Sequence, residues 1–282
     1  MALDAGFARA RFLSGYEPPG SVPENYRPGA AALLVAALPY GSGGAAPPDA
    51  PGAVAPFAQR NYYREGVLRL QALAKTLRAR YGGMKSDFRI LCNSPVPEKP
   101  LAAACGLGAL GRNGLIITPE AGSLCIIAAL TLPFPLAGDS PETGPLGYCA
   151  SCGHPPPCAA ACPTGAARGD GTIDTKRCIQ WYASGNGLDV PEAVLRHWGN
   201  RLYGCTDCQD RCVRNQKAVK AVATGRGSLP SCIDPRRILA MTDRELACMF
   251  KGTALGMAWL GPQNIRRNAR CILLSGMRRR GA

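Results

Sequence analysis

The sequence has few of the residues on which hydrolytic and group-transfer enzymes usually depend. It contains two histidines, His154 and His197, and it lacks an HExxH pair, a Walker phosphate loop and a nucleophile elbow. Charged residues make up only 18% of the chain, whereas hydrophobic residues make up 46%. This balance excludes wholesale disorder, because a chain with so much apolar surface can bury a core.

Long apolar stretches are also missing. The longest uninterrupted apolar runs, such as Ala30–Leu38, fall far below the roughly 20 residues needed to cross a bilayer. The first residues carry charges where a signal peptide would need its apolar stretch, and no repeat of solenoid length is present. We therefore expect a soluble, cytoplasmic, monomeric protein that makes no membrane contact.

Positive charge is abundant and unevenly distributed. The chain has 33 Lys and Arg against 19 Asp and Glu, a net charge of +14. The segment Arg196–Ala282 alone holds 17 basic and 5 acidic residues, so almost all of the excess lies in the C-terminal third. Such a segment is typical of a protein with a polyanionic partner, since neutralising phosphates releases counterions. A merely solvated surface is the alternative.

Fourteen cysteines are the most distinctive feature of the composition. In a cytosolic chain they are expected to be metal ligands rather than disulfides. Eight of them lie between Cys149 and Cys212. The remaining six are expected to act mostly as small buried hydrophobic residues: Cys92, Cys105, Cys125, Cys232, Cys248 and Cys271.

The eight clustered cysteines form two related half-motifs. The first runs C-x2-C-x5-C-x3-C-P from Cys149 to Pro163, and the second has Cys178 followed, after a long gap, by C-x2-C-x3-C ending at Cys212. In the ferredoxin run C-x2-C-x2-C-x3-C-P, the fourth cysteine binds the other cluster. The pattern therefore predicts two [4Fe–4S] clusters. The ligands of the first are Cys149, Cys152, Cys158 and Cys212; those of the second are Cys162, Cys178, Cys205 and Cys208.

Two departures from the ferredoxin pattern leave an alternative open. Three extra residues lengthen the gap between Cys152 and Cys158, and Val213 replaces the usual proline after the last cysteine. A pair of tetrahedral zinc sites would use the same C-x2-C spacing, although the C-x3-C-P ending favours iron–sulfur clusters. His154, in the lengthened gap, is a further candidate ligand.

Helical and strand patterns alternate before the cysteines and predict an α/β (α+β) core. The expected elements are a buried strand after the turn at Arg27-Pro28, a helix over Arg60–Tyr81, strands at Phe88–Cys92, Leu115–Thr118 and Leu124–Thr131, and a helix from Glu98. A loop is expected at Gly41–Gly52, a polar break at Thr224–Ser228, and a helix beginning in a capping box at Thr242. The predicted domains are residues 1–135 (cofactor-binding core), 136–216 (ferredoxin-like double-cluster domain) and 217–282 (basic helical C-terminal segment).

Several of these motifs together resemble the epoxyqueuosine reductase family. They are Ala161-Cys-Pro-Thr-Gly-Ala166, Asn200-Arg-Leu-Tyr-Gly-Cys-Thr-Asp-Cys-Gln209, Cys105-Gly-Leu-Gly-Ala-Leu-Gly-Arg-Asn-Gly114 and Asn264-Ile-Arg-Arg-Asn-Ala269. The resemblance implies a base-off cobalamin on the core, reduced by the nearer cluster, and reduction of an epoxide on a tRNA nucleoside to an alkene. It also implies tRNA held by the basic C-terminal third, and an external electron donor such as a flavodoxin or ferredoxin.

The resemblance also assigns cofactor-binding residues on the core. They are Gly108, Gly111, Arg112, Asn113, Gly122 and Ser123. Glycines allow the backbone to approach a large ring or its phosphate closely. A tight turn that needs no cofactor is the equal alternative for the segment around Gly108–Asn113. For Gly122-Ser123 a turn is the first interpretation, and the cofactor contact rests on the resemblance alone. The run Gly106–Gly111 also matches G-x-G-x-x-G, but it follows a helical pattern rather than a strand, which excludes a dinucleotide site.

The expected position of the catalytic acid is where the sequence departs most from the family. Epoxide opening needs a proton donor near the departing oxygen. An ungapped match places Cys92 where the family has an aspartate, and Glu98 is the nearest carboxylate. We therefore take Cys92 and Glu98 as the catalytic candidates. Two other hypotheses remain: a cobalamin-dependent reductase of a small molecule, for example of the dehalogenase type, and a non-catalytic iron–sulfur electron carrier.

Overall fold

The structure is a computed structural model that describes residues 1–17, 30–40, 46, 50–187, 189–216 and 227–280, with side chains up to 276. Most of the loop expected at 41–52 and of the break expected at 224–228 lies outside these residues, as do the side chains of Arg278, Arg279 and Arg280. Across the described ranges, every helix is too short or too polar to span a bilayer. The contacts divide the chain into two units. Unit 1 is Met1–Pro39, Tyr62–Cys152 and Val213–Ala218; unit 2 is Tyr40–Asn61, Gly153–Cys212 and Val219–Ala282.

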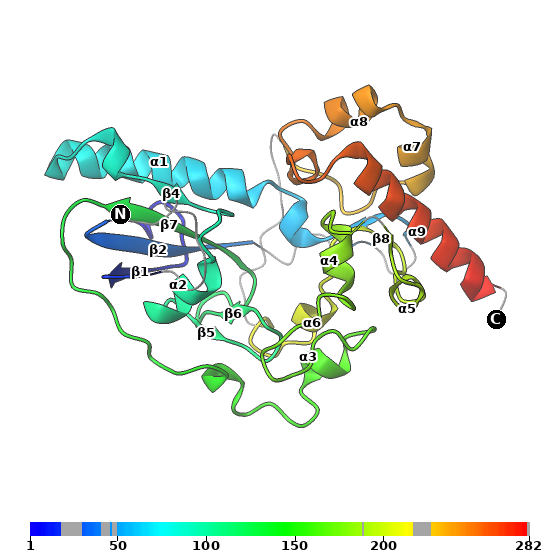
Figure 1. Ribbon diagram of the computed structural model, residues 1–282, viewed down its shortest axis with the longest axis horizontal. Helices are drawn as coiled ribbons and strands as arrows, with labels where there is room; N and C mark the ends of the chain where they lie inside the picture. The colour runs from blue at the N-terminus through cyan, green and yellow to red at the C-terminus, as the bar shows by residue number, and fades with distance from the viewer. Residues whose placement is uncertain (18–29, 41–45, 47–49, 188, 217–226, 281–282) are drawn as a thin grey trace. The chain divides into compact units, whose positions relative to one another are not determined.

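Unit 1 is built on a four-stranded sheet (Figure 1). Its order is β1 (Arg9–Ser14), β2 (Ala32–Pro39), β7 (Cys125–Leu132) and β4 (Ile90–Leu91), and each pair is antiparallel. The core is therefore of the α+β kind, and the buried strand after Arg27 and the strands near residues 88–92 and 124–131 are confirmed. Strand β1 was not expected from the sequence.

Helices cover both faces of this sheet because β2 is apolar on both sides. Helix α1 (Tyr62–Tyr81) approaches one face at Gly66, where an added Cβ would lie 3.8 Å from the Leu38 and Ala128 side chains. The odd-numbered β2 residues, such as Val35, pack instead with Leu101 of α2 (Glu98–Ala104). This alternation is the two-residue period of a strand buried between two layers.

The predicted end of helix α1 and the strand predicted at Leu115–Thr118 are also observed. Helix α1 stops at Gly82 and Gly83, whose φ angles are +80° and +98°, values that favour glycine. A two-residue strand β5 (Ala109–Leu110) pairs antiparallel with β6 (Ile116–Ile117) and forms a separate hairpin. The strand expected at 115–118 therefore exists but does not join the main sheet.

Unit 2 packs around the fully buried Trp198, with short strands and helices contributed by three separate parts of the chain. Strands β3 (Ala53–Val54) and β8 (Arg201–Tyr203) are parallel. The helices are α3 (Pro157–Ala160), α4 (Ile179–Ala183), α5 (Glu192–Leu195), α6 (Asp207–Asp210), α7 (Pro235–Ala240), α8 (Asp243–Phe250) and α9 (Pro262–Arg280). The 3-10 turns of the two units are η2 (Pro56–Ala58), η3 (Lys85–Asp87), η4 (Gly147–Cys149) and η5 (Ala254–Gly256).

This division differs from the expected domains 1–135, 136–216 and 217–282. The apolar core of unit 2 joins Val54, Trp198 and Ile265, so the cysteine-bearing segment and the C-terminal helices share one core. Separate folding of these two segments would expose that shared core to water. The capping box at Thr242 is confirmed: its hydroxyl accepts the Glu245 N–H, and the Glu245 carboxylate accepts the Thr242 N–H at 2.7 Å.

Helix α9 is joined to the cysteine-bearing segment by one buried amide. The Asn268 side chain is fully buried, and its Nδ2 donates to the carbonyls of Ala183, at the end of α4, and Leu202, in β8. Beside it, the Arg267 guanidinium donates to the Tyr182 and Gly187 carbonyls. These bonds tie α9 to the two elements that immediately flank Cys178 and Cys205 in the chain.

Replacing Asn268 by Ala should lower the free energy of unfolding by about 2–4 kcal/mol, because two buried carbonyls lose their donor. Chemical denaturation measures this change. Arg270→Ala, at an exposed position on the same helix, is the matched control and should change stability by less than about 0.5 kcal/mol. An Asn268→Ala variant as stable as this control would show that the amide is not needed to join the elements.

Candidate cluster and cofactor site

The first two predicted ligands lie in a tight turn of unit 1. Cys149 ends η4, and its carbonyl accepts the Cys152 N–H at 3.0 Å, which is the short C-x2-C turn that the pattern predicts. The Arg112 backbone N–H lies 3.5 Å from Cys149 Sγ and donates to it. Hydrogen bonds to the ligand sulfurs are a usual feature of iron–sulfur sites.

The predicted ligands of the second cluster all lie in unit 2 and sit at the ends of its elements. Cys162 follows α3, Cys178 is the N-terminal cap of α4, Cys205 follows β8, and Cys208 lies in α6. Cys162 Sγ accepts the backbone N–H of Ala167 at 3.4 Å. These positions follow from the sequence, since Pro163 and Gly165 prevent α3 from continuing past its cysteine.

Electrostatics show that the thiols of the second set lie close together. Burial is the largest cause that raises the pKa of Cys208. The charges of Cys205, Cys162 and Cys178, and that of Cys158 from the first set, raise it further. Burial and Asp207 raise the pKa of Cys205 to about 12, although the Arg201 guanidinium acts against them. The raised pKa values of Cys205 and Cys208 favour their protonated thiols when no cation is bound, whereas a cationic cluster binds by displacing these protons. The donor set therefore fits an iron–sulfur cluster.

The grouping of the eight ligands into two sets stays a prediction. Cys149 and Cys152 belong to unit 1 and Cys158 and Cys212 to unit 2. Across the described parts of the chain, no three Cys, His, Asp or Glu side chains are grouped so that they could hold a single metal ion. A cubane places each thiolate on a different iron atom, so its ligands are more widely spaced than those of one ion.

Replacing Cys208 by Ala should remove one cluster and leave the other. We expect anaerobically reconstituted protein to fall from about eight to about four iron atoms per chain, because the second set loses a ligand. Iron and sulfide analysis measures this. Cys248→Ala, at an exposed cysteine outside both half-motifs, is the control and should retain full iron. Unchanged iron in Cys208→Ala would remove this cysteine from the ligand set.

The glycines of the predicted cofactor turn are required by the protein's own chain. At Gly106, where φ is +68°, an added Cβ would lie 2.5 Å from the Ser140 carbonyl oxygen. At Gly108 and Gly111 it would collide with the backbone and side chain of Ile117, respectively. The tight-turn interpretation therefore explains these glycines, and their contact with a cofactor stays a prediction.

Asn113 is the residue of this turn whose environment points to a ligand. Its side chain is 2% exposed, and its Oδ1 accepts the Leu115 N–H at 3.2 Å. Its Nδ2, by contrast, is buried with no hydrogen-bond partner among the described residues. An unpaired buried amide is costly, and a bound ligand that offers an acceptor would relieve that cost. The turn therefore fits a polar cofactor at this residue.

The second predicted cofactor segment, Gly122-Ser123, contacts a residue that sequence reasoning missed. Asn215 Oδ1 accepts the Ser123 N–H at 2.8 Å, and a Cβ at Gly122 would lie only 2.1 Å from that oxygen. The Asn215 amide also donates to Ser123 Oγ at 3.0 Å. Asn215 ends the motif Cys212-Val-Arg-Asn, which was the available signal. Its role needed the fold, because 92 residues separate it from Ser123.

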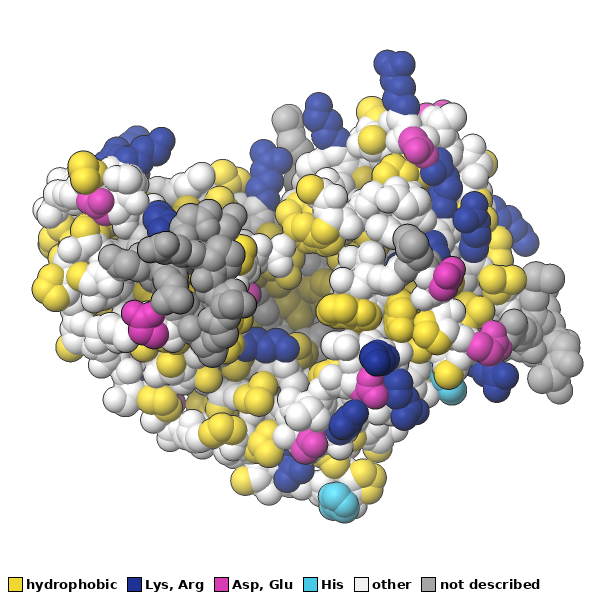
Figure 2. Space-filling model, viewed as in Figure 1, with side chains coloured by type: hydrophobic (Ala, Val, Ile, Leu, Met, Phe, Trp, Pro, Cys, Tyr) yellow, Lys and Arg dark blue, Asp and Glu magenta, His cyan; other side chains and the backbone are white. Residues whose placement is uncertain are grey.

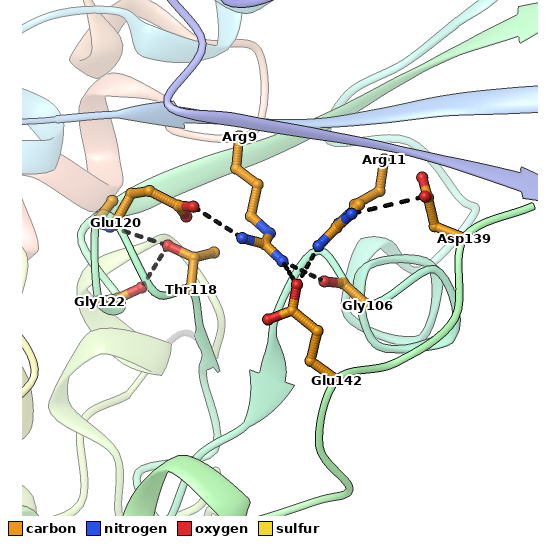
Figure 3. A network of polar contacts seen from close by, with 9 residues as sticks. Arg9, Arg11, Gly106, Thr118, Glu120, Gly122, Asp139 and Glu142 are labelled. Atoms are coloured by element: carbon orange, nitrogen blue, oxygen red, sulfur yellow. Dashed lines mark hydrogen bonds and ion pairs between the residues drawn. The ribbon is translucent and has the colours of Figure 1, made fainter.

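A network centred on Arg9 ties both turns to the chain that leads to Cys149 (Figure 3). Arg9 donates to Glu120 at 2.8 Å, to the Gly106 carbonyl at 3.4 Å and to Glu142. Arg11 shares Glu142 and lies 3.6 Å from Asp139. Burial lowers the Arg9 pKa, but the bonds to Glu120 and Glu142 outweigh that effect and raise it. One side chain of β1 thus joins three segments.

Replacing Arg9 by Gln should lower the melting temperature by a few degrees at pH 7. The Arg9 guanidinium lowers the pKa of Glu142, so the ion pair stabilises the fold above the ordinary pKa of a glutamate. Its contribution disappears as the pH falls through the lowered value. The gap between wild type and Arg9→Gln should therefore narrow below about pH 4 in thermal melts. A difference in melting temperature that stays constant with pH would contradict the pairing. So would an equally large effect of Arg9→Gln when Glu142 has already been replaced by Gln.

The two catalytic candidates differ in their surroundings. The Cys92 thiol donates to the Tyr63 carbonyl of α1 at 3.8 Å, and burial, followed by the Glu98 charge, raises its pKa to about 12. Glu98 begins α2 and accepts the Ser94 N–H at 3.2 Å. Burial raises the pKa of Glu98, although backbone N–H bonds act against it. Of the two groups, Glu98 is the stronger acid.

Comparison with known proteins supports the iron–sulfur interpretation. Residues 148–215 match the 4Fe-4S double cluster binding domain family. The epoxyqueuosine reductase of Salmonella typhimurium is 35% identical over 158 residues, which cover 56% of this chain and 39% of that protein. The structure of the Bacillus subtilis enzyme, with its catalytic aspartate loop swung out of the active site, matches 97% of this chain and 79% of that one, with 25% identity and a TM-score of 0.79.

The resemblance to epoxyqueuosine reductases is confirmed. A crystal structure of epoxyqueuosine reductase with an epoxyqueuosine-modified stem loop of tRNA-Tyr also matches, with 25% identity and a TM-score of 0.78 over 97% of this chain and 79% of that one. In sequence, the chain matches less than half of the length of its curated epoxyqueuosine reductase relatives. The double-cluster match favours iron–sulfur clusters over the zinc alternative.

Proposed function

We propose that this protein is an iron–sulfur and cobalamin-dependent oxidoreductase that reduces epoxyqueuosine to queuosine in tRNA. The observation that carries the proposal is the likeness to the tRNA-bound epoxyqueuosine reductase, which extends over 97% of the chain and includes the double-cluster segment. We further propose a cytoplasmic monomer that takes electrons from a flavodoxin or ferredoxin.

The reaction removes the epoxide oxygen as water and leaves a carbon–carbon double bond. It consumes two electrons and two protons, and both C–O bonds break. The eight cysteines would hold two [4Fe–4S] clusters that pass single electrons inward, and bound cobalamin would supply a low-valent cobalt as the direct reductant. Asn113 would bind the cofactor through its buried Nδ2, which fits an acceptor on the ligand.

The protein's own chemical task is to deliver a proton to the departing oxygen. Glu98 suits this task, because burial raises its pKa and keeps more of it protonated near neutral pH. Cys92 suits it poorly, since a thiol with a pKa of about 12 releases its proton reluctantly. We therefore assign the donor to Glu98 and give Cys92 a packing role against α1.

A cobalamin-dependent reductase of a small molecule is the second candidate. It is favoured by Cys92, which in our ungapped match takes the place of the family aspartate, since a changed acid is compatible with a changed substrate. Single-turnover assays of the reduced, fully loaded protein with epoxyqueuosine-containing tRNA distinguish the candidates. Formation of queuosine supports the first, and absence of product with intact clusters and cobalamin contradicts it.

Replacing Glu98 by Gln should lower the single-turnover rate by about 10²–10⁴-fold, the usual contribution of a general acid. Since the protonated form is the active one, the wild-type rate should fall as the pH rises through the Glu98 pKa. This fall in rate with rising pH should be absent from Glu98→Gln. Cys92→Ala is the matched control and should keep most of the activity. Loss of activity in Cys92→Ala, with Glu98→Gln unaffected, would return the donor role to Cys92.

A further inference from the structure

A groove on unit 1 runs between helix α1 and strand β4 and is lined by none of the residues assigned so far. Its volume is about 620 Å³, within the usual range of ligand sites. We call it the α1–β4 groove. Three of its lining residues are cations, Lys75, Arg78 and Lys85, and its apolar wall includes Val67, Phe88 and Ile90.

The three cations come from two elements and face the same space. Lys75 and Arg78 are three residues apart on α1, which places them on one helix face, and Lys85 begins η3. Figure 2 shows basic side chains gathered over the C-terminal end of α1, at the upper left. The sequence count missed this concentration, because the acidic residues of the first 195 residues nearly cancel its charge in the sum.

No internal anion neutralises these cations among the residues that the structure describes. No carboxylate lines the described walls of the groove, and none of the three cations forms an ion pair or side-chain hydrogen bond there. On the same helix, Arg69 is paired with Glu65. The Asp87 carboxylate accepts the Met84 N–H at 2.7 Å. Three like charges around one hollow repel one another, and a bound anion relieves this repulsion.

The net charge along the sequence suggested that the C-terminal third binds the polyanion. Some cations of this segment, however, already form contacts within the protein. Arg201 binds Asp207, Arg266 binds Asp243, and Arg267 donates to backbone carbonyls. A guanidinium that a carboxylate already neutralises, as in Arg201 and Arg266, contributes less to phosphate binding than an unpaired cation does. Net charge along the sequence therefore overstates the free positive charge of that segment.

We propose that the α1–β4 groove binds the phosphate backbone of RNA, and the choice of RNA rests on the proposed function. Three cations around a concave surface give a polyanion several contacts in one place, and the apolar wall suits sugars between phosphates. Tyr81 favours RNA over an acidic protein. It follows Arg78 by three residues on α1. Phe134 and Arg80 lie against its ring, yet its side chain is 56% exposed, and the exposed part of an aromatic ring can stack on a base.

The test is binding of a fluorescent tRNA anticodon stem loop without the modified nucleoside, followed by anisotropy over a series of salt concentrations. The groove variant carries Lys75→Ala, Arg78→Ala and Lys85→Ala. The matched control carries Lys176→Ala, Arg237→Ala and Arg244→Ala, which remove the same charge at exposed positions outside the groove. We expect the groove variant to bind at least about tenfold more weakly at 0.1 M salt, with a salt slope reduced by about 2–3. The control should stay near wild type.

Equal losses in both variants would show that net charge rather than the groove binds RNA and would overturn the proposal, as would unchanged binding by the groove variant. Displacement of the RNA by poly-glutamate at equal charge concentration would assign the groove to an acidic protein, which also overturns it. The proposed reaction is judged separately. Groove-dependent binding by a loaded enzyme that forms no queuosine contradicts the reaction alone, and full turnover with groove-independent binding contradicts the groove alone.

Discussion

A cluster of thiols around Cys208, whose charges raise the pKa of that residue, is the constraint on which this structure depends. Cys208 lies close enough to Cys162, Cys178 and Cys205 for their charges to act on it, and burial adds to the effect. Burial and these charges disfavour a free Cys208 thiolate, whereas a bound cation would stabilise it. The elements of unit 2 hold these cysteines at their ends, and Asn268 fixes two of those elements from α9.

Unit 1 meets a different requirement, which is to hold in place, beside its sheet, several turns that have little regular structure of their own. Glycines at Gly106, Gly108 and Gly111 allow the chain to pack against itself, and Asn215 fills the space beside Gly122. Arg9 then joins the turns through Glu120, Glu142 and a backbone carbonyl. The Nδ2 of Asn113 is buried without a hydrogen-bond partner among the described residues, and it lies where a cofactor was expected.

Local patterns predicted the local features of this protein. The apolar run of β2, the period of α1 with its terminal glycines and the capping box at Thr242 could be read from neighbouring residues. Strand β1 was missed because its sequence mixes arginines with apolar residues. The pairing of β6 with β5 and the shared core of unit 2 depend on contacts between distant residues, which periodicity does not encode.

The candidate site shows the same limit. The cysteine spacing predicted two clusters, and the segment that carries it matches a double-cluster family. The roles of Arg9 and Asn215 required the fold, since each acts across about a hundred residues. The acid strengths of Cys92 and Glu98 depend on burial, and the α1–β4 groove collects charges from separate segments. Residue identity alone therefore pointed to the chemistry of the clusters more reliably than to the proton donor.

The most direct measurement is Mössbauer spectroscopy with metal analysis on protein purified under strict anaerobic conditions from cells grown with ⁵⁷Fe. The account predicts about eight iron atoms per chain, all in the doublets of [4Fe–4S] clusters. Stoichiometric zinc in place of iron, held by the same cysteines, would contradict it.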